Sequence, residues 1–147
     1  MKSFAYVILS MLIGGCTSNA TTQEATQPKQ EVIEEHDYHE VEHLRIFWSE
    51  IFKQSGSTYY VYLYSETCSH CNSIKNIMID KALKDDETIY FVSSSFEHNI
   101  ADTGSTGVKE ISNLYIRGYP TLLKLEEKTV VLNVSGTILI REELNLK

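Results

Sequence analysis

The feature that most constrains this sequence is a pair of cysteines, Cys68 and Cys71, that stands between two different hydrophobic patterns. Before the pair, residues 58–64 (TYYVYLY) are uncharged and rich in aromatic and β-branched side chains, which is typical of a strand buried on both faces. After the pair, apolar residues recur at helical spacing to about residue 84: Ile74, Ile77, Met78 and Ala82. The pair therefore opens a helix directly after a central strand.

Cysteines in this position can act as a reversible redox switch. Two sulfurs one helical turn apart can close a disulfide with little backbone movement. The unpaired amides and the positive end of the helix dipole favour an anion at the first cysteine, so Cys68 is the candidate nucleophile. Cys71 lies one turn further in and would resolve a mixed disulfide by attacking Cys68. As an imidazolium, His70 would stabilise a thiolate, favour the reduced pair and make the pair a stronger oxidant.

The same periodicities predict the rest of the folded part. A second apolar strand over residues 88–92 completes a strand, helix, strand unit that should be parallel and right-handed. The polar loop after it, residues 93–107, is long enough for a functional role. The remaining predictions are a short strand over residues 31–34, an amphipathic helix over 38–53, a short helix over 108–115, a strand hairpin over 121–125 and 129–134, and a last helix over 137–146.

The first fifteen residues are predicted to be a targeting segment. Lys2 is followed by an apolar run over residues 4–13, which is too short for the roughly 20 residues of a membrane-spanning helix. The run ends in Gly14-Gly15-Cys16, which resembles a bacterial lipoprotein box. That resemblance implies removal of residues 1–15 and a lipid on Cys16. The alternative is an ordinary signal peptide followed by an unrelated cysteine.

Composition and charge limit the domain count and the partners. Residues 16–30 are Thr- and Gln-rich without apolar periodicity, so we expect a flexible tether there and one folded domain over residues 31–147. With 13 basic and 20 acidic residues the formal net charge is −7, which argues against nucleic acid as a partner. We expect a monomer whose partner is a protein, a peptide or a small molecule.

The cysteine pair resembles a known family when it is taken with the segment NLYIRGYPTL, residues 113–122. Together they are similar to the thioredoxin superfamily, and the match spans about residues 31–147. The resemblance implies an α/β thioredoxin-like fold, with a central mixed sheet flanked by helices. It also implies that Pro120 is cis and faces the dithiol, and that Tyr119 offers its backbone to an extended substrate. A cis X-Pro bond costs only about 0.5 to 1 kcal/mol.

Three departures from the family pattern refine this expectation. Thioredoxins proper carry Trp before the first cysteine and Gly-Pro between the two, where this chain has Thr67 and the pair Ser69-His70. The histidine is instead similar to that of secreted dithiol oxidases. Tyr62 stands where many members have a buried acid six residues before the first cysteine, so the proton acceptor for Cys71 is not identified. Ser69 and His70 are the residues expected to tune the redox potential.

These observations favour a thiol-disulfide oxidoreductase that needs no cofactor beyond its own Cys68–Cys71 disulfide. A lipid on Cys16 would hold it at the extracytoplasmic side of the cell membrane, where it would act on secreted or cell-surface proteins or peptides. Oxidation or isomerisation is favoured over reduction because of His70. The size and layout also resemble the small accessory thioredoxin-like proteins that help bacteriocins acquire disulfides.

Other interpretations of the same residues stay open. A close cysteine pair can be a structural disulfide or half of a zinc site. Cys68, Cys71 and histidines would also suit a lipoprotein that binds or delivers a metal ion. A second set of histidines recurs at helical spacing among acidic residues and is expected to form a solvated face rather than a metal site: His36, His39 and His43. His98, in the long loop, is as compatible with an inert position as with one facing substrate.

Overall fold

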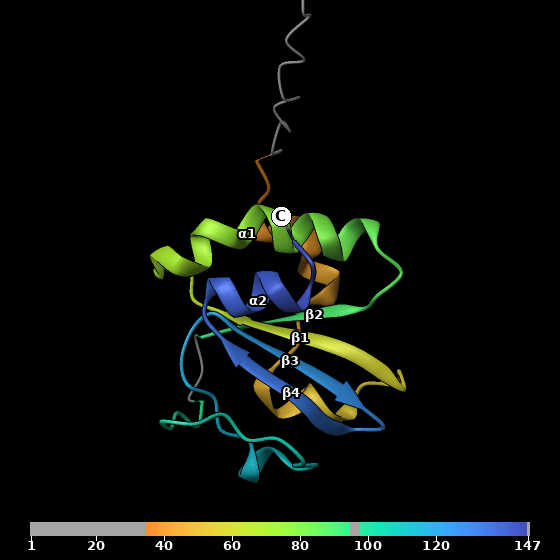
Figure 1. Cartoon of the computed structure of the whole chain (residues 1–147). Helices are drawn as coiled ribbons and strands as arrows, with labels where there is room; N and C mark the ends of the chain where they lie inside the picture. The colour runs from red at the N-terminus through yellow and green to blue at the C-terminus, as the bar shows by residue number, and fades with distance from the viewer. Residues whose placement is uncertain (1–34, 95–97, 147) are drawn as a thin grey trace, which may run out of the picture. The chain divides into compact units, whose positions relative to one another are not determined.

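A four-stranded mixed sheet organises the part of the chain that the computed structural model describes, residues 35–94 and 98–146 (Figure 1). The order across the sheet is β2 (Ile89–Ser93), β1 (Thr58–Tyr64), β3 (Thr121–Glu126) and β4 (Thr129–Ser135). β1 pairs in parallel with β2, whereas the β1–β3 and β3–β4 pairs are antiparallel. The expected α/β class with a central mixed sheet is confirmed.

The predicted leader, Cys16, the tether and the short strand over residues 31–34 lie outside the described residues. Within the described ranges, no helix has the length and apolar character needed to cross a membrane.

The central strand separates two apolar cores because its side chains alternate between the faces of the sheet. Every residue of β1 after Thr58 is buried. On one face, Tyr60, Tyr62 and Tyr64 pack in the core that includes α1 (Ser69–Lys84) and α2 (Thr137–Glu143). On the other face, Tyr59, Val61 and Leu63 pack against Ile51, Leu114 and Ile116. Figure 1 shows α1 and α2 together on one side of the sheet. The strand and helix that flank the cysteine pair match their predicted positions.

The predicted helix over residues 38–53 is wrong. The structure has two 3-10 helices instead, η1 (Tyr38–Leu44) and η2 (Trp48–Lys53). Between them Arg45 bridges to Phe91 of β2, and the Ile46 amide donates to the Phe91 carbonyl at 2.9 Å. The chain therefore covers the outer edge of β2 and crosses from one core to the other, since η1 packs in the α1 core and η2 in the opposite one.

The predicted helix over residues 108–115 is also wrong, because only η3 (Ile111–Asn113) forms. The backbone before it pairs with the free edge of β4: Gly107 N–H donates to the Val130 carbonyl at 2.7 Å, and Val130 N–H donates to Val108 at 3.0 Å. The Val108 carbonyl, which a helix beginning there would use to accept the amide four residues later, is therefore bonded to the sheet edge instead. The last helix is shorter than expected and ends at Glu143, with Asn145 in the left-handed region at φ 51°.

Candidate active site

Cys68 occupies the N-cap position of α1, the place where helices most often have Ser, Thr, Asp or Asn. Its backbone is extended (φ −87°, ψ 118°), and its sulfur accepts the Cys71 N–H at 3.3 Å. The side chain is half-buried, so the sulfur is reachable from solvent. The turn thus presents one thiol at the positive end of a sixteen-residue helix, where a thiolate would be stabilised.

Cys71 lies one turn further along and is fully buried. Both cysteines are free thiols in this structure. The Cys71 sulfur accepts the Ser65 N–H at 3.5 Å. Burial raises the pKa of the Cys71 thiol to about 12, and its hydrogen bond with Cys68 adds to the shift. The pair therefore consists of one accessible thiol and one sheltered thiol that holds its proton.

The segment before β3 comes to the same place as the dithiol. The Tyr119–Pro120 peptide is cis, as the family resemblance implied. The Cys68 thiol donates to the Tyr119 carbonyl at 3.7 Å, and Pro120 itself is buried. The Pro120 carbonyl accepts the Gly136 N–H at 2.9 Å, which ties this loop to the start of α2. The structure thus brings Tyr119, the residue before Pro120, into contact with Cys68, which is 51 positions away in the sequence.

Ser69 and His70 have exposed side chains in the first turn of α1. The His70 carbonyl accepts the Ser73 hydroxyl at 2.8 Å, but no hydrogen bond joins the imidazole to either sulfur within the described residues. The tuning role of Ser69 and His70 therefore stays a prediction.

A cluster of buried tyrosines occupies the position where an acid was missing. Tyr62 is fully buried, and burial raises its pKa far above the ordinary value, with Tyr38 and Cys71 adding to the shift. The rings of Tyr38 and Tyr64 stack with their centroids 3.9 Å apart. The hydroxyl groups of these three tyrosines are buried, and none makes a hydrogen bond of normal geometry. Cys71 therefore shares its core with neutral phenols. Glu66, an acid two residues before Cys68, is exposed to solvent.

His98 and Trp48 are the site residues whose placement the sequence did not predict. His98 Nδ1 is hydrogen bonded to the Tyr119 hydroxyl, and its ring stacks on Trp48. The sequence places Trp48 within the predicted helix over residues 38–53 and gives His98 either an inert or a substrate-facing position. No local signal connects either residue with position 119, because the contact depends on how η2 and the long loop pack on the sheet.

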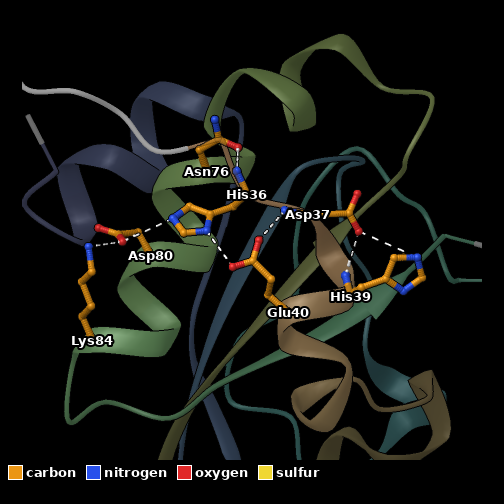
Figure 2. A network of polar contacts seen from close by, with 7 residues as sticks. All are labelled: His36, Asp37, His39, Glu40, Asn76, Asp80 and Lys84. Carbon is orange, nitrogen blue, oxygen red and sulfur yellow. Dashed lines mark hydrogen bonds and ion pairs between the residues drawn. The ribbon is translucent and has the colours of Figure 1, made fainter.

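The prediction of a solvated histidine face is wrong at His36, which is only 9% exposed. Its Nδ1 is hydrogen bonded to Glu40 at 2.9 Å, and its Nε2 lies 3.4 Å from an Asp80 oxygen on α1 (Figure 2). The chain before η1 is extended rather than helical, so residues 36 and 39 do not share a helix face. His39 and His43 are exposed, as expected.

The alternative that Cys68, Cys71 and histidines bind a metal ion gains no support from the described side chains. Among the described residues, no three His, Cys, Asp or Glu side chains gather closely enough to hold a metal ion.

Known proteins similar to this chain are found among solved structures. The sequence matches no protein-family model and no curated protein. Among solved structures the chain is similar to the long form of thioredoxin f from spinach chloroplast, with 17% identity over 69% of this chain and 81% of that chain and a TM-score of 0.48. It is also similar to the thioredoxin pre-protein of Schistosoma mansoni (15% identity, 65% and 83% covered, TM-score 0.43) and to thioredoxin f2 of Chlamydomonas reinhardtii (12%, 70% and 96%, 0.43).

Proposed function

We propose that this protein is a thiol-disulfide oxidoreductase held at the extracytoplasmic face of the cell membrane by a lipid on Cys16. One observation carries the proposal: an accessible thiol caps α1, touches the carbonyl of Tyr119 before a cis proline, and has a buried thiol one turn behind it. The apolar leader and the Gly14-Gly15-Cys16 box support the location.

The reaction transfers two electrons between the dithiol and a partner. In the reducing direction, the Cys68 thiolate attacks one sulfur of the substrate disulfide, that S–S bond breaks, and the departing sulfur takes the electron pair and a proton. Cys71 then loses its proton and attacks Cys68, which releases the second substrate thiol and leaves the Cys68–Cys71 disulfide. In the oxidising direction every step reverses, and a substrate dithiol becomes a disulfide.

Secreted or cell-surface proteins and peptides are the proposed substrates. An extended peptide beside Tyr119 would place its sulfur next to Cys68, because the Tyr119 carbonyl lies 3.7 Å from the Cys68 sulfur.

Oxidation or isomerisation is the proposed direction, since an imidazolium at His70 would stabilise the reduced pair. Net oxidation requires a second disulfide reagent to reset the dithiol after each cycle.

Trapping tests the function and the assignment of roles together. Cys71→Ser removes the resolving thiol, so we expect mixed disulfides between Cys68 and extracytoplasmic proteins, visible on non-reducing gels and released by reductant. Cys68→Ser is the matched control and should capture nothing. Capture by Cys68→Ser alone would reverse the two roles. A protein that traps no partner and exchanges no disulfide in solution would contradict the function.

A further inference from the structure

His98 links two aromatic side chains beside the dithiol. Its ring stacks on Trp48, the first residue of η2, with centroids 4.6 Å apart and planes 24° apart. On its other side, Nδ1 is hydrogen bonded to the hydroxyl of Tyr119, and the centroids of these two rings are 5.7 Å apart. The imidazole therefore fixes the Tyr119 side chain relative to η2.

This contact reaches the reactive sulfur through one residue. The Tyr119 side chain binds His98, while the carbonyl of the same residue accepts the Cys68 thiol at 3.7 Å. Tyr119 is thus held at both ends: His98 binds its ring, and the following residue, Pro120, is buried and tied to Gly136 through its carbonyl. Trp48, His98 and Tyr119 thus form a continuous path from η2 to Cys68.

The polar groups around His98 fit a neutral imidazole. Burial lowers the pKa of His98, and none of the charged groups in the described residues contributes to its shift. The elements packed against the ring present Trp48 and Tyr119, of which only Tyr119 titrates. Burial raises the pKa of Tyr119 to about 12, so its phenol is neutral as well. The phenol O–H can therefore donate to Nδ1, with the imidazole proton on Nε2.

Protonation of His98 would break this arrangement. An imidazolium has a proton on both nitrogens, so Nδ1 could no longer accept the phenol proton. Nε2 is buried, and the part of the chain that the structure describes offers it neither a hydrogen-bond partner nor a counter-ion for a charged ring.

We propose that neutral His98 is a positioning residue of the exchange site: it holds Tyr119 against Trp48 and so sets the Tyr119 carbonyl beside Cys68 for an extended peptide. This inference rests on the proposed thiol-disulfide function. His98 does not touch the reacting sulfurs, so it acts through Tyr119 on the binding of peptide and not on the sulfur chemistry.

The stack can be tested without any redox reaction, because Trp48 is the single tryptophan of the chain. In the purified protein, Trp48 emission should change as the pH falls and His98 protonates, with a midpoint below the ordinary histidine value of 6.5 because burial lowers the pKa of His98. His98→Phe, which keeps an aromatic ring without a titrating nitrogen, should remove this transition. His39→Phe, at an exposed histidine, should retain it. An unchanged transition in His98→Phe would contradict the inference.

Kinetics test the positioning role. With a disulfide-bonded peptide as the probe, His98→Phe and Tyr119→Phe should each raise KM about 3- to 10-fold, the effect of one lost hydrogen bond, with little change in kcat. The double variant should be no worse than either single one. With 5,5′-dithiobis(2-nitrobenzoate), a small disulfide without a peptide backbone, the rate of His98→Phe should stay within about twofold of wild type. His98→Asn, which keeps a polar group near Nδ1, should recover part of the peptide KM.

The outcomes distinguish failure of the positioning role of His98 from failure of the proposed thiol-disulfide exchange activity. Additive effects in the double variant, or equal losses with both probes, would overturn the positioning role and leave the exchange activity intact. A wild-type protein that exchanges neither disulfide would overturn both.

Discussion

At the scale of single residues, the site works through the contrast between its two cysteines. Cys68 is half-buried at a helix N-cap, and Cys71 is fully buried one turn later. The pKa of about 12 for Cys71 means that its thiolate is scarce at neutral pH. Attack by Cys71 on a mixed disulfide therefore requires a proton acceptor, and the apolar core that holds Cys71 contains buried tyrosines.

Alkylation kinetics test this contrast. In reduced protein at pH 8, iodoacetamide should modify Cys68 in Cys71→Ser at least about 100-fold faster than Cys71 in Cys68→Ser, because only thiolates react and Cys71 keeps its proton. The rate for Cys68→Ser should rise about tenfold per pH unit as the pH approaches 12. Mass spectrometry against time gives both rates, and urea-unfolded samples serve as the control. Equal folded-state rates would contradict the sheltered position of Cys71.

The identity of the pair was predictable from the sequence, whereas its surroundings were not. A cysteine pair after an uncharged strand and before a helical pattern is a local signal. The approach of Tyr119 came only from the family resemblance, and the contact of His98 with Tyr119 came from neither source. Side chains brought together by packing leave no periodic trace in a sequence.

At the scale of elements, the segment before the central strand also shows that packing cannot be predicted from periodicity. Residues 38–53 carry one continuous helical periodicity, but η1 and η2 pack on opposite faces of the sheet. Periodicity reports that a residue is buried and not which core buries it. The sequence predicted the elements in which a single hydrophobic periodicity coincides with a single strand or helix: β1, α1, β2, β3 and β4.

His36 joins the segment before η1 to α1 and should make stability depend on pH. The Glu40 hydrogen bond raises the pKa of His36 most, burial opposes this, and the charges of Glu40 and Asp80 raise it further. Because the folded-state pKa lies above that of the unfolded chain, the contribution is complete below about pH 6.5 and is lost as the pH rises through the folded value. The segment is therefore held more firmly in mildly acidic solution.

Urea denaturation at two pH values tests the contribution of the His36 contacts with Glu40 and Asp80 to stability. His36→Gln should lower the free energy of unfolding by about 1 to 2 kcal/mol at pH 6, a modest loss because both carboxylate partners are more than a third exposed. The loss should be smaller at pH 8.5, because the contribution of His36 falls as the pH rises through its folded-state pKa. His39→Gln, at an exposed neighbour, is the matched control and should change little at either pH. A loss for His36→Gln that grows with pH would contradict the assignment.

At the scale of the whole molecule, we propose that a lipid anchor holds the domain with the cysteine pair at the membrane. The domain is described by the structure, and the anchor is a prediction from the first sixteen residues. Wild-type protein should fractionate with membranes and have a mature N-terminus at a lipid-modified Cys16, because about 0.8 kcal/mol per buried CH₂ makes acyl chains an effective anchor. Cys16→Ser should leave the membrane fraction and keep full exchange activity. Membrane retention of Cys16→Ser equal to wild type would contradict the anchor.

The most direct test of the central claim is equilibration of the purified protein in glutathione buffers of graded potential, followed by mass spectrometry of alkylated thiols. We expect a reversible two-electron transition between free thiols and a Cys68–Cys71 disulfide, with a midpoint between about −270 and −120 mV and toward the oxidising end of that range. A pair that stays as thiols at every potential, or that forms only mixed disulfides with glutathione, would contradict the claim.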